Sequence, residues 1–283
     1  MHCSSPIVTT LNAMATARYV DTVPAPDKVR EKRIIVLSYS RSGTLGLCKA
    51  MEVLGYKPYN MGQVVRNGYS HIKMFQEALQ ASEDRQGGRY AKEDLDKWLG
   101  DYDALTIVSC YLIDEIVAAY PDAQFILTVR EPETWAKSIW NTIGKLDEAS
   151  TSFPLAFIKR FDKANLAFCD LVNLIFGRIT GGHGRTDAGY QHAMAEFQRH
   201  NEKAKSMIPP EQLLVVKLED GLGWEQICPF LGVDIPDTPY PRQNDPNDFK
   251  NNVMKFFEPG KRKAMGFVAG TFAAVALGLW YML

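Results

Sequence analysis

Residues 33–54, RIIVLSYSRSGTLGLCKAMEVL, decide the fold of this 283-residue chain. The segment begins with RIIVL at 33–37, a short apolar run rich in β-branched residues that is typical of a buried parallel strand. A turn containing glycine follows, and Leu47, Met51 and Leu54 then recur at helical spacing. Strand, tight turn and helix make the first half of a βαβ unit, so the segment predicts a parallel sheet.

The same alternation continues along the chain. Further strands are expected at 104–108 (ALTIV), 124–129 (QFILTV) and 213–216 (LLVV). Helices are expected around residues 113–117, over 133–143 and over 224–231, and the interval 144–208 is mostly helical with a glycine-rich loop at 177–189. Strands that alternate with helices predict an α/β fold with a doubly wound parallel sheet.

The composition is that of a globular protein without an electrostatic bias. Lys and Arg number 32 against 33 Asp and Glu, and this balance argues against a nucleic-acid-binding protein driven by basic charge. Apolar residues make up 46% of the chain, enough for one large α/β domain or two small ones. The five cysteines form no C-x-x-C pair, which argues against a disulfide framework or a zinc site and fits a reducing compartment.

The C-terminal segment 264–283, AMGFVAGTFAAVALGLWYML, carries no charge. A helix of this length spans ~30 Å, the thickness of the hydrocarbon core of a bilayer. Three basic residues precede it at 261–263, and Trp280 and Tyr281 lie near its far end, as at the two interfaces of a membrane. The alternative is a buried terminal helix of a soluble domain, but such helices usually carry a polar face. We expect a single-pass tail anchor with the body in the cytosol, on the endoplasmic reticulum.

These features predict four segments along the chain. Residues 1–30, with scattered Ser, Thr, Ala and Pro and no long apolar run, are expected to be a flexible leader. Residues 31–250 form the α/β domain, and 251–263 form a basic linker to the transmembrane anchor at 264–283.

The turn after the first strand has the form of an anion site. The backbone amides of Ser42, Gly43, Thr44 and Leu45 would point into one concavity at the positive end of a helix, and Arg41 adds a guanidinium that can grip phosphate oxygens. The pattern G-x-x-x-x-G-K-[ST] of a Walker A loop is absent. The alternative is an ordinary turn in which glycine serves only the geometry.

A second motif, TVREPETWAKSIWN, occupies residues 128–141. Arg130 follows the end of a strand, where ligands of open α/β sheets bind, and Ser138 lies on the next helix. The two residues are expected to hold a second phosphate, some distance from the first loop. The alternative is a surface arginine in an ion pair with Glu131 or Glu133.

The two motifs together resemble those of the sulfotransferases that use the sulfate donor PAPS, and most closely a fungal and bacterial branch. The resemblance rests on R-[ST]-G-T at 41–44 and V-R-[DE]-P-E-x-W-x-x-S at 129–138. The segments that agree further are LGDYDA (99–104), AAYPDAQFILTVREPETW (118–135), HNEKAKSMIPPEQLLV (200–215) and GWEQICPFLGVDIPDTPYPRQND (223–245). The likeness spans roughly residues 33–250.

The resemblance implies a sulfonyl transfer from PAPS to a hydroxyl of an apolar small molecule, in secondary metabolism. It assigns the 5′-phosphosulfate of the donor to Arg41, Ser42, Gly43, Thr44 and Leu45. It assigns the 3′-phosphate to Arg130 with Ser138. In the branch a second threonine usually follows G-T, where this chain has Leu45 and so lacks one hydroxyl donor.

The general base is less defined, because the segment after LGDYDA departs from the branch at residues 107–110. The remaining candidates are His71, Glu77 and Asp114, of which we select His71 beside Arg41 as the catalytic pair. His192 and His200 lie in a polar helical stretch and are expected at the surface.

Two other functions remain open. The same loop could grip the diphosphate of an isoprenoid in a terpenoid cyclase or transferase, with Mg²⁺ assisting, although no D-D-x-x-D run occurs. The chain could also be a non-catalytic membrane protein that retains the fold. No metal site is predicted from the sequence, and the expected partners are an apolar or lipid-like substrate and the membrane, with no nucleic acid.

Overall fold

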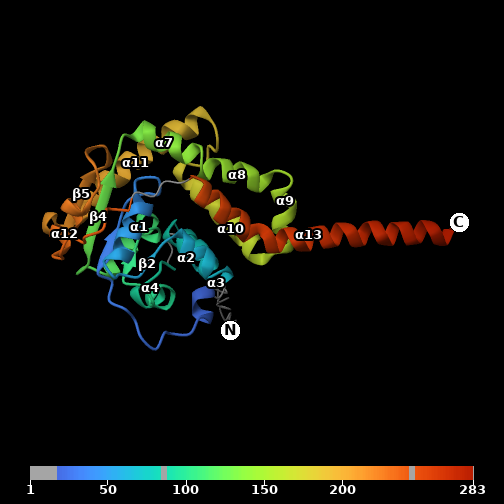
Figure 1. The fold of residues 1–283 in the computed structure, drawn as a ribbon, viewed down its shortest axis with the longest axis horizontal. Coiled ribbons are helices and arrows are strands. Elements are labelled where there is room, and N and C mark those ends of the chain that lie inside the picture. The colour runs from blue at the N-terminus through green and yellow to red at the C-terminus, as the bar shows by residue number, and fades with distance from the viewer. Residues whose placement is uncertain (1–17, 84–87, 242–245, 283) are drawn as a thin grey trace, which may run out of the picture.

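The computed structural model describes residues 18–83, 88–241 and 246–282. Its centre is a five-stranded parallel sheet of order β2-β3-β1-β4-β5. The strands are β1 (Ile34–Val36), β2 (Pro58–Tyr59), β3 (Ala104–Leu105), β4 (Gln124–Val129) and β5 (Leu213–Lys217). The expected α/β fold is therefore confirmed, with β1 between β3 and β4 (Figure 1).

Helices cover both faces of the sheet (Figure 1). They are α1 (Thr44–Val53), α2 (Met61–Arg66), α3 (Tyr69–Glu83), α4 (Lys92–Leu99), α5 (Val108–Tyr111), α6 (Ile113–Ala119), α7 (Pro132–Trp140), α8 (Ile143–Thr151), α9 (Leu155–Ile158), α10 (Lys163–Ile179), α11 (Asp187–Met207), α12 (Trp224–Leu231) and α13 (Pro246–Met282). Short 3-10 turns are η1 (Tyr19–Thr22), η2 (Lys159–Phe161), η3 (Pro210–Gln212) and η4 (Leu218–Asp220).

Alternation along β1 divides the core into two parts. Ile34 and Val36 pack with residues of α1 and α12, whereas Ile35 faces the larger cluster that includes α3, α7, α10 and α11. Successive side chains of a strand point to opposite faces, so a run of consecutive apolar residues is buried on both sides. The strand predicted at 33–37 thus takes the central position that its apolar composition requires.

Several boundaries differ from the sequence expectation. The strand expected at 104–108 ends at Leu105, and residues 108–111 turn into α5, where the Ser109 hydroxyl donates to the Val36 carbonyl. The single helix expected at 133–143 is divided into α7 and α8. The two-residue strand β2 and the helices α2 to α4 were not predicted.

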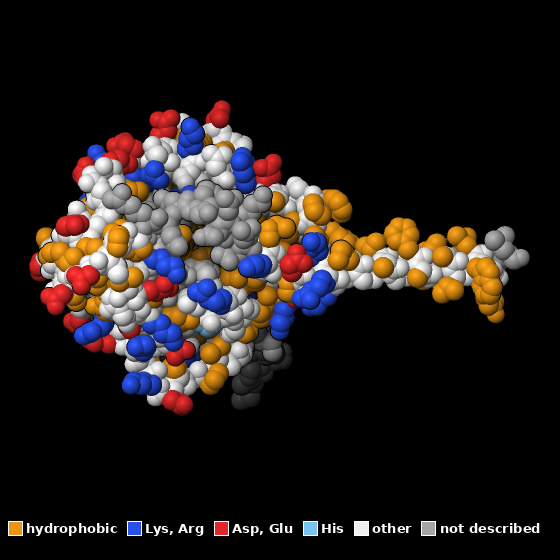
Figure 2. Space-filling view, viewed as in Figure 1, with side chains coloured by type: hydrophobic (Ala, Val, Ile, Leu, Met, Phe, Trp, Pro, Cys, Tyr) orange, Lys and Arg blue, Asp and Glu red, His pale blue; other side chains and the backbone are white. Residues whose placement is uncertain are grey.

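The C-terminal helix α13 projects from the body, and Figure 2 shows apolar side chains along it. Among the described residues, one helix is long and apolar enough to cross a membrane, over Met254–Tyr281. Only 6% of its most apolar 18-residue stretch is buried against the rest of the protein. The apolar part of this helix is therefore exposed, whereas the alternative of a buried terminal helix would place it inside the body. Residues 251–263, expected as a linker, are instead part of this helix, whose Phe257 and Ala264 pack against the body.

Part of the expected leader also packs on the body. The leader was expected at residues 1–30, and residues 1–17 lie outside the described part. Val20, in η1, is fully buried. The Glu77 carboxylate accepts hydrogen bonds from the amides of Tyr19 and Val20 and so holds this segment on the body. Arg18 adds an ion pair with Asp94 at 2.8 Å.

Candidate active site

The loop between β1 and α1, residues 37–43, is shaped to bind an anion. Arg41 and Gly43 both have left-handed backbone conformations, with φ of 71° and 78°. Alternation of left- and right-handed residues turns successive amides into one concavity, and the positive end of the α1 dipole adds to its potential. Among the described residues, the amides of Ser42 to Leu45 have no hydrogen-bond partner in the protein.

Residues of β4 and α7 hold the loop in this shape through its carbonyl oxygens. The buried Thr128 hydroxyl donates to the Ser42 carbonyl, and Trp135 Nε1 donates to the Ser40 carbonyl at 2.9 Å. Arg130 Nη1 donates to the Arg41 carbonyl at 2.8 Å. Because the loop carbonyls accept hydrogen bonds from β4, α7 and Arg130 between them, the loop amides are left free to bind a ligand.

The two arginines expected at separate phosphate sites lie together. Arg41 Nε donates to the Ser138 hydroxyl at 3.0 Å, and Arg130 bonds to the backbone of Arg41. Shielding of the Arg41 guanidinium from water, followed by repulsion from Arg130, lowers the pKa of Arg41. Arg130 and Ser138 therefore adjoin the loop that carries Arg41, whereas the sequence analysis expected them some distance from it.

Neither arginine is neutralised by a carboxylate. In the described part of the chain Arg41 and Arg130 form no ion pair, so the alternative pairing of Arg130 with Glu131 or Glu133 is not found. Arg130 Nε is buried without a hydrogen-bond partner among these residues. Two adjacent uncompensated guanidinium groups repel each other, and a bound polyanion would relieve that repulsion.

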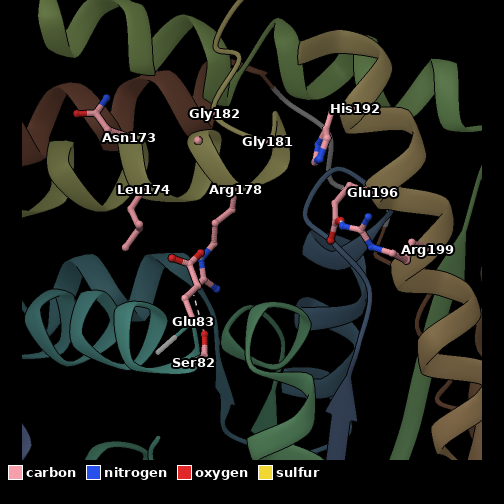
Figure 3. Close-up of a pocket in the computed structure, with 11 residues that line it drawn as sticks. Ser82, Glu83, Asn173, Leu174, Arg178, Gly181, Gly182, His192, Glu196 and Arg199 are labelled. Atoms are coloured by element: carbon pink, nitrogen blue, oxygen red, sulfur yellow. Dashed lines mark hydrogen bonds and ion pairs between the residues drawn. The ribbon is translucent and has the colours of Figure 1, made fainter. Parts of the chain in front are cut away.

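A cavity of about 670 Å³ lies between α3, α10 and α11 (Figure 3). More apolar than polar surface faces this space, and the residues that line it are Ser82, Glu83, Asn173, Leu174, Gly177, Arg178, Gly181, Gly182, His192, Glu196 and Arg199. Figure 3 shows Arg178 of α10 and Glu83 of α3 side by side, and their Nε and Oε1 atoms are 2.6 Å apart. A smaller cavity of about 200 Å³ shares four of these residues and reaches Tyr39 and His200.

Glu196 connects this space to the anion-binding loop. Its Oε1 accepts a hydrogen bond from the Tyr39 hydroxyl at 3.0 Å, and its Oε2 forms an ion pair with Arg199. Tyr39 precedes Arg41 by two residues, and burial raises the pKa of Tyr39 well above its ordinary value. The phenol therefore remains protonated and donates to the carboxylate.

Helix α11 also supports the loop from behind. His200 is 5% exposed and its Nε2 lies 2.6 Å from the Leu37 carbonyl, so this nitrogen carries the proton. Burial lowers the pKa of His200 to about 4. The expectation of a surface position for His200 was wrong, because its face of α11 packs against the loop at Leu37 and Tyr39. His192 is half-buried and lines the larger cavity.

The base candidates from the sequence have other surroundings. His71 Nδ1 lies 3.0 Å from the Tyr59 hydroxyl, and burial lowers the pKa of His71 to about 4. It is not among the residues that line either cavity. Glu77 holds the N-terminal segment, and Asp114, at the edge of the smaller cavity, pairs with Lys203 at 2.7 Å.

Sequence reasoning missed Glu196, although a signal for it exists. His192, Glu196 and His200 recur at intervals of four and so share one face of α11. Within the described residues, no group of three or more His, Cys, Asp or Glu side chains could hold a metal ion.

Comparison with known proteins gives the family. A family model described as "Sulfotransferase domain" matches residues 33–249. The chain belongs to the sulfotransferase family. The match covers the sheet, the anion-binding loop and both cavities, and it agrees with the resemblance carried by the motifs at 41–44 and 129–138.

This sulfotransferase-family chain is also similar to individual proteins. It is 31% identical over 212 residues to "Ava biosynthesis cluster protein M" of Aspergillus versicolor, covering 74% of this chain and 79% of that one. A crystal structure of a sulfotransferase from Alicyclobacillus acidocaldarius matches with 15% identity and a TM-score of 0.43, over 85% and 96% of the two chains. Sulfotransferase STF1 from Mycobacterium tuberculosis H37Rv matches with 11% identity and a TM-score of 0.30, over 87% and 72%.

Proposed function

We propose that the protein is a membrane-attached sulfotransferase that moves the sulfonyl group of PAPS to a hydroxyl of a small molecule. One observation carries this proposal. Arg41 and Arg130 adjoin each other at the N-terminus of α1 without a carboxylate partner among the described residues, beside amides that have no protein partner. Such a site calls for a ligand with more than one phosphate-like group.

The residues divide between the two ends of the donor. The amides of Ser42 to Leu45 with Arg41 would hold the 5′-phosphosulfate, and Arg130 with Ser138 would hold the 3′-phosphate. Ser138 Oγ accepts from Arg41 Nε in the structure and keeps its own proton for donation to a phosphate oxygen. Donors fixed in this way stabilise the charge that develops on the leaving phosphate oxygen during transfer.

The acceptor would enter the cavity between α3, α10 and α11. Its hydroxyl oxygen attacks sulfur, the bond from sulfur to the bridging phosphate oxygen breaks, and the hydroxyl proton passes to a base. We assign this base to Glu196, since its carboxylate lines the cavity and is bonded to Tyr39 of the donor loop. The lining combines four charged side chains with a larger share of apolar surface, which suits an acceptor that carries polar groups on an apolar body.

The setting of the reaction follows from two further observations. The relative from Aspergillus versicolor is named for a biosynthesis cluster, which supports a role in secondary metabolism. The exposed apolar part of α13 supports attachment to a membrane, with the catalytic domain in the cytosol and the endoplasmic reticulum as the proposed site.

Calorimetric titration of the full chain in detergent with PAP, the product of PAPS, tests the donor site. We expect wild-type binding and at least a tenfold loss for Arg41→Ala and for Arg130→Ala. Arg33→Ala, which removes a 64% exposed guanidinium at the opposite end of β1, serves as the matched control and should bind normally. Absence of PAP binding by the wild type would overturn the proposal, and binding of farnesyl diphosphate in its place would favour the diphosphate enzyme.

The base is tested separately. Glu196→Gln keeps the hydrogen bond from Tyr39 but cannot take a proton, so PAP affinity should persist while turnover falls about 10²- to 10⁴-fold. Unchanged turnover by the folded variant would remove Glu196 from this role. The corresponding test of the earlier candidate is His71→Gln, which we expect to retain activity.

A further inference from the structure

Residues 153–163 lie beside the point where α13 leaves the body (Figure 1). The Phe161 ring, in η2, packs against Phe267 with centroids 5.4 Å apart. Asp162 Oδ2 accepts from Lys263 Nζ at 2.9 Å, and Gly260 of α13 closely approaches the Ile158 carbonyl. The contacts span the junction between the basic and the apolar parts of α13, so this segment is fixed at a defined level along the helix.

The segment combines half-buried apolar side chains with one strongly exposed aromatic ring. No residue of α9 or η2 is fully buried, although the sequence there is LAFIKRF. Phe153, just before α9, is 84% exposed, and Leu166 on the first turns of α10 is 38% exposed. The interface of a bilayer accommodates such a ring when basic side chains lie around it.

Basic side chains surround these apolar groups, and Figure 2 shows them gathered at the base of the projecting helix. In the described part of the chain, Lys159, Arg160, Lys163 and Arg262 form no ion pair, and the last three are exposed. Their charge complements the anionic headgroups of a cytoplasmic leaflet. The acids nearby, Asp162 and Glu258, are already paired with Lys263 and Lys261.

We propose that residues 153–163, together with the basic turn of α13 at 261–263, form a membrane-contact surface that binds anionic phospholipid headgroups. This surface rests on the proposed attachment through α13 and adds a second, orienting contact to it. Phe153 enters the interface, while Arg160 and Lys163 contact lipid phosphates. Because α13 continues into the body as a helix, the contact fixes the tilt of the domain as well as its distance from the bilayer.

The orientation has a consequence for the acceptor. Helix α10 begins at this surface with Lys163, and its residues Asn173 to Arg178 line the larger cavity. At 1.5 Å per residue the cavity lies roughly 15–22 Å along the helix from the surface. The membrane-contact surface and the acceptor cavity are thereby held apart at the two ends of one helix.

The test places an environment-sensitive fluorophore on the full chain in phosphatidylcholine vesicles, with and without phosphatidylserine. The label is attached to Phe153→Cys in a Cys3→Ser background, since Cys48, Cys110, Cys169 and Cys228 are buried. Ile235→Cys, at a 53% exposed apolar position after α12, is the matched control. We expect a blue shift and quenching by brominated lipid at 153 only, with the quenching at least twofold stronger when phosphatidylserine is present.

Charge reversal provides the second variant. Arg160→Glu with Lys163→Glu should abolish the effect of phosphatidylserine at 153, while flotation shows that α13 still holds the chain on the vesicles. Equal blue shifts and quenching at residues 153 and 235 would refute the proposed membrane-contact surface. A phosphatidylserine effect that persists after charge reversal would refute it as well. PAP titration on the same samples separates the two proposals. If PAP still binds while the fluorophore at residue 153 reports an aqueous environment, only the membrane-contact surface is refuted. Failure of flotation removes the anchor and the surface together.

Discussion

Acidification should destabilise this protein through His200, a buried histidine that is neutral in the native state. Its Nε2 donates to the Leu37 carbonyl, and burial lowers its pKa to about 4 from the ordinary 6.5. Between these two values the unfolded chain binds a proton that the native state excludes. The stabilising contribution is therefore present above the unfolded pKa and is lost as the pH falls toward 4.

The size of the effect follows from the two pKa values. With 6.5 in the unfolded state and about 4 in the native state, proton linkage removes about 2 kcal/mol of unfolding free energy between pH 7 and pH 5. Lys203 is the charged neighbour, and it disfavours protonation further. His71, whose pKa burial also lowers to about 4, acts in the same direction, so the wild-type loss exceeds the share of His200.

Chemical denaturation of the full chain in detergent at pH 7 and pH 5 measures the loss, with a matched variant to isolate His200. His200→Gln places an amide N–H near the position of Nε2 and keeps a donor for the Leu37 carbonyl, but it does not titrate. The decrease between the two pH values should therefore be smaller in the variant by about 2 kcal/mol. An equal decrease in both proteins would refute the burial of an uncharged imidazole at this position.

Two further substitutions test the anion-binding loop. Gly43→Ala should destabilise the protein by the ~1–2 kcal/mol cost of a left-handed alanine, because the new Cβ meets only the flexible end of the half-buried Leu218 side chain, which can move aside. Gly55→Ala, with φ of 84° and open space around it, should cost the same, and a clearly larger loss at Gly43 in denaturation would show that Leu218 cannot move. Leu45→Thr places a hydroxyl at the start of α1 and should raise PAP affinity about 3- to 10-fold in calorimetry. The control Val53→Thr, at the far end of the same helix, should leave PAP affinity unchanged. A lower PAP affinity of Leu45→Thr would show that the leucine is needed for binding.

The sequence predicted those parts of the fold whose pattern is local. The strand at 124–129 and the helix at 224–231 were predicted with the bounds that the structure has, since each carries its own periodicity and its own end signals. The strand at 104–108 was predicted too long, because the Thr106 amide and hydroxyl both bond to the Tyr59 carbonyl and the chain then turns into α5. That partner belongs to β2, a strand of two residues that is too short to show a period.

For the candidate site too, the sequence predicted what depends on local pattern and not what depends on long-range contacts. The loop at 41–45 and the arginine after β4 were found from local motifs, because strand ends and helix N-termini can be located in a sequence. Their proximity could not be found, since it depends on β4 lying beside β1 in the sheet. The choice of His71 over Glu77 and Asp114 rested on residue type alone. Glu196 was not among the candidates, because which face of α11 turns inward depends on contacts with distant residues.

Helix α11 gives the reason why donor and acceptor sites should act together. His200 bonds to the Leu37 carbonyl and Glu196 to the Tyr39 hydroxyl, both in the loop at 37–43. Between them, the Phe197 ring stacks on Trp135 at 4.4 Å, and Trp135 bonds to the Ser40 carbonyl. The face of α11 that carries Glu196 also carries His192 in the cavity, so an acceptor that shifts the helix also shifts the loop. Because close-packed interiors transmit such displacements, occupancy of the cavity and affinity for PAP should be thermodynamically coupled, in both directions and by the same factor.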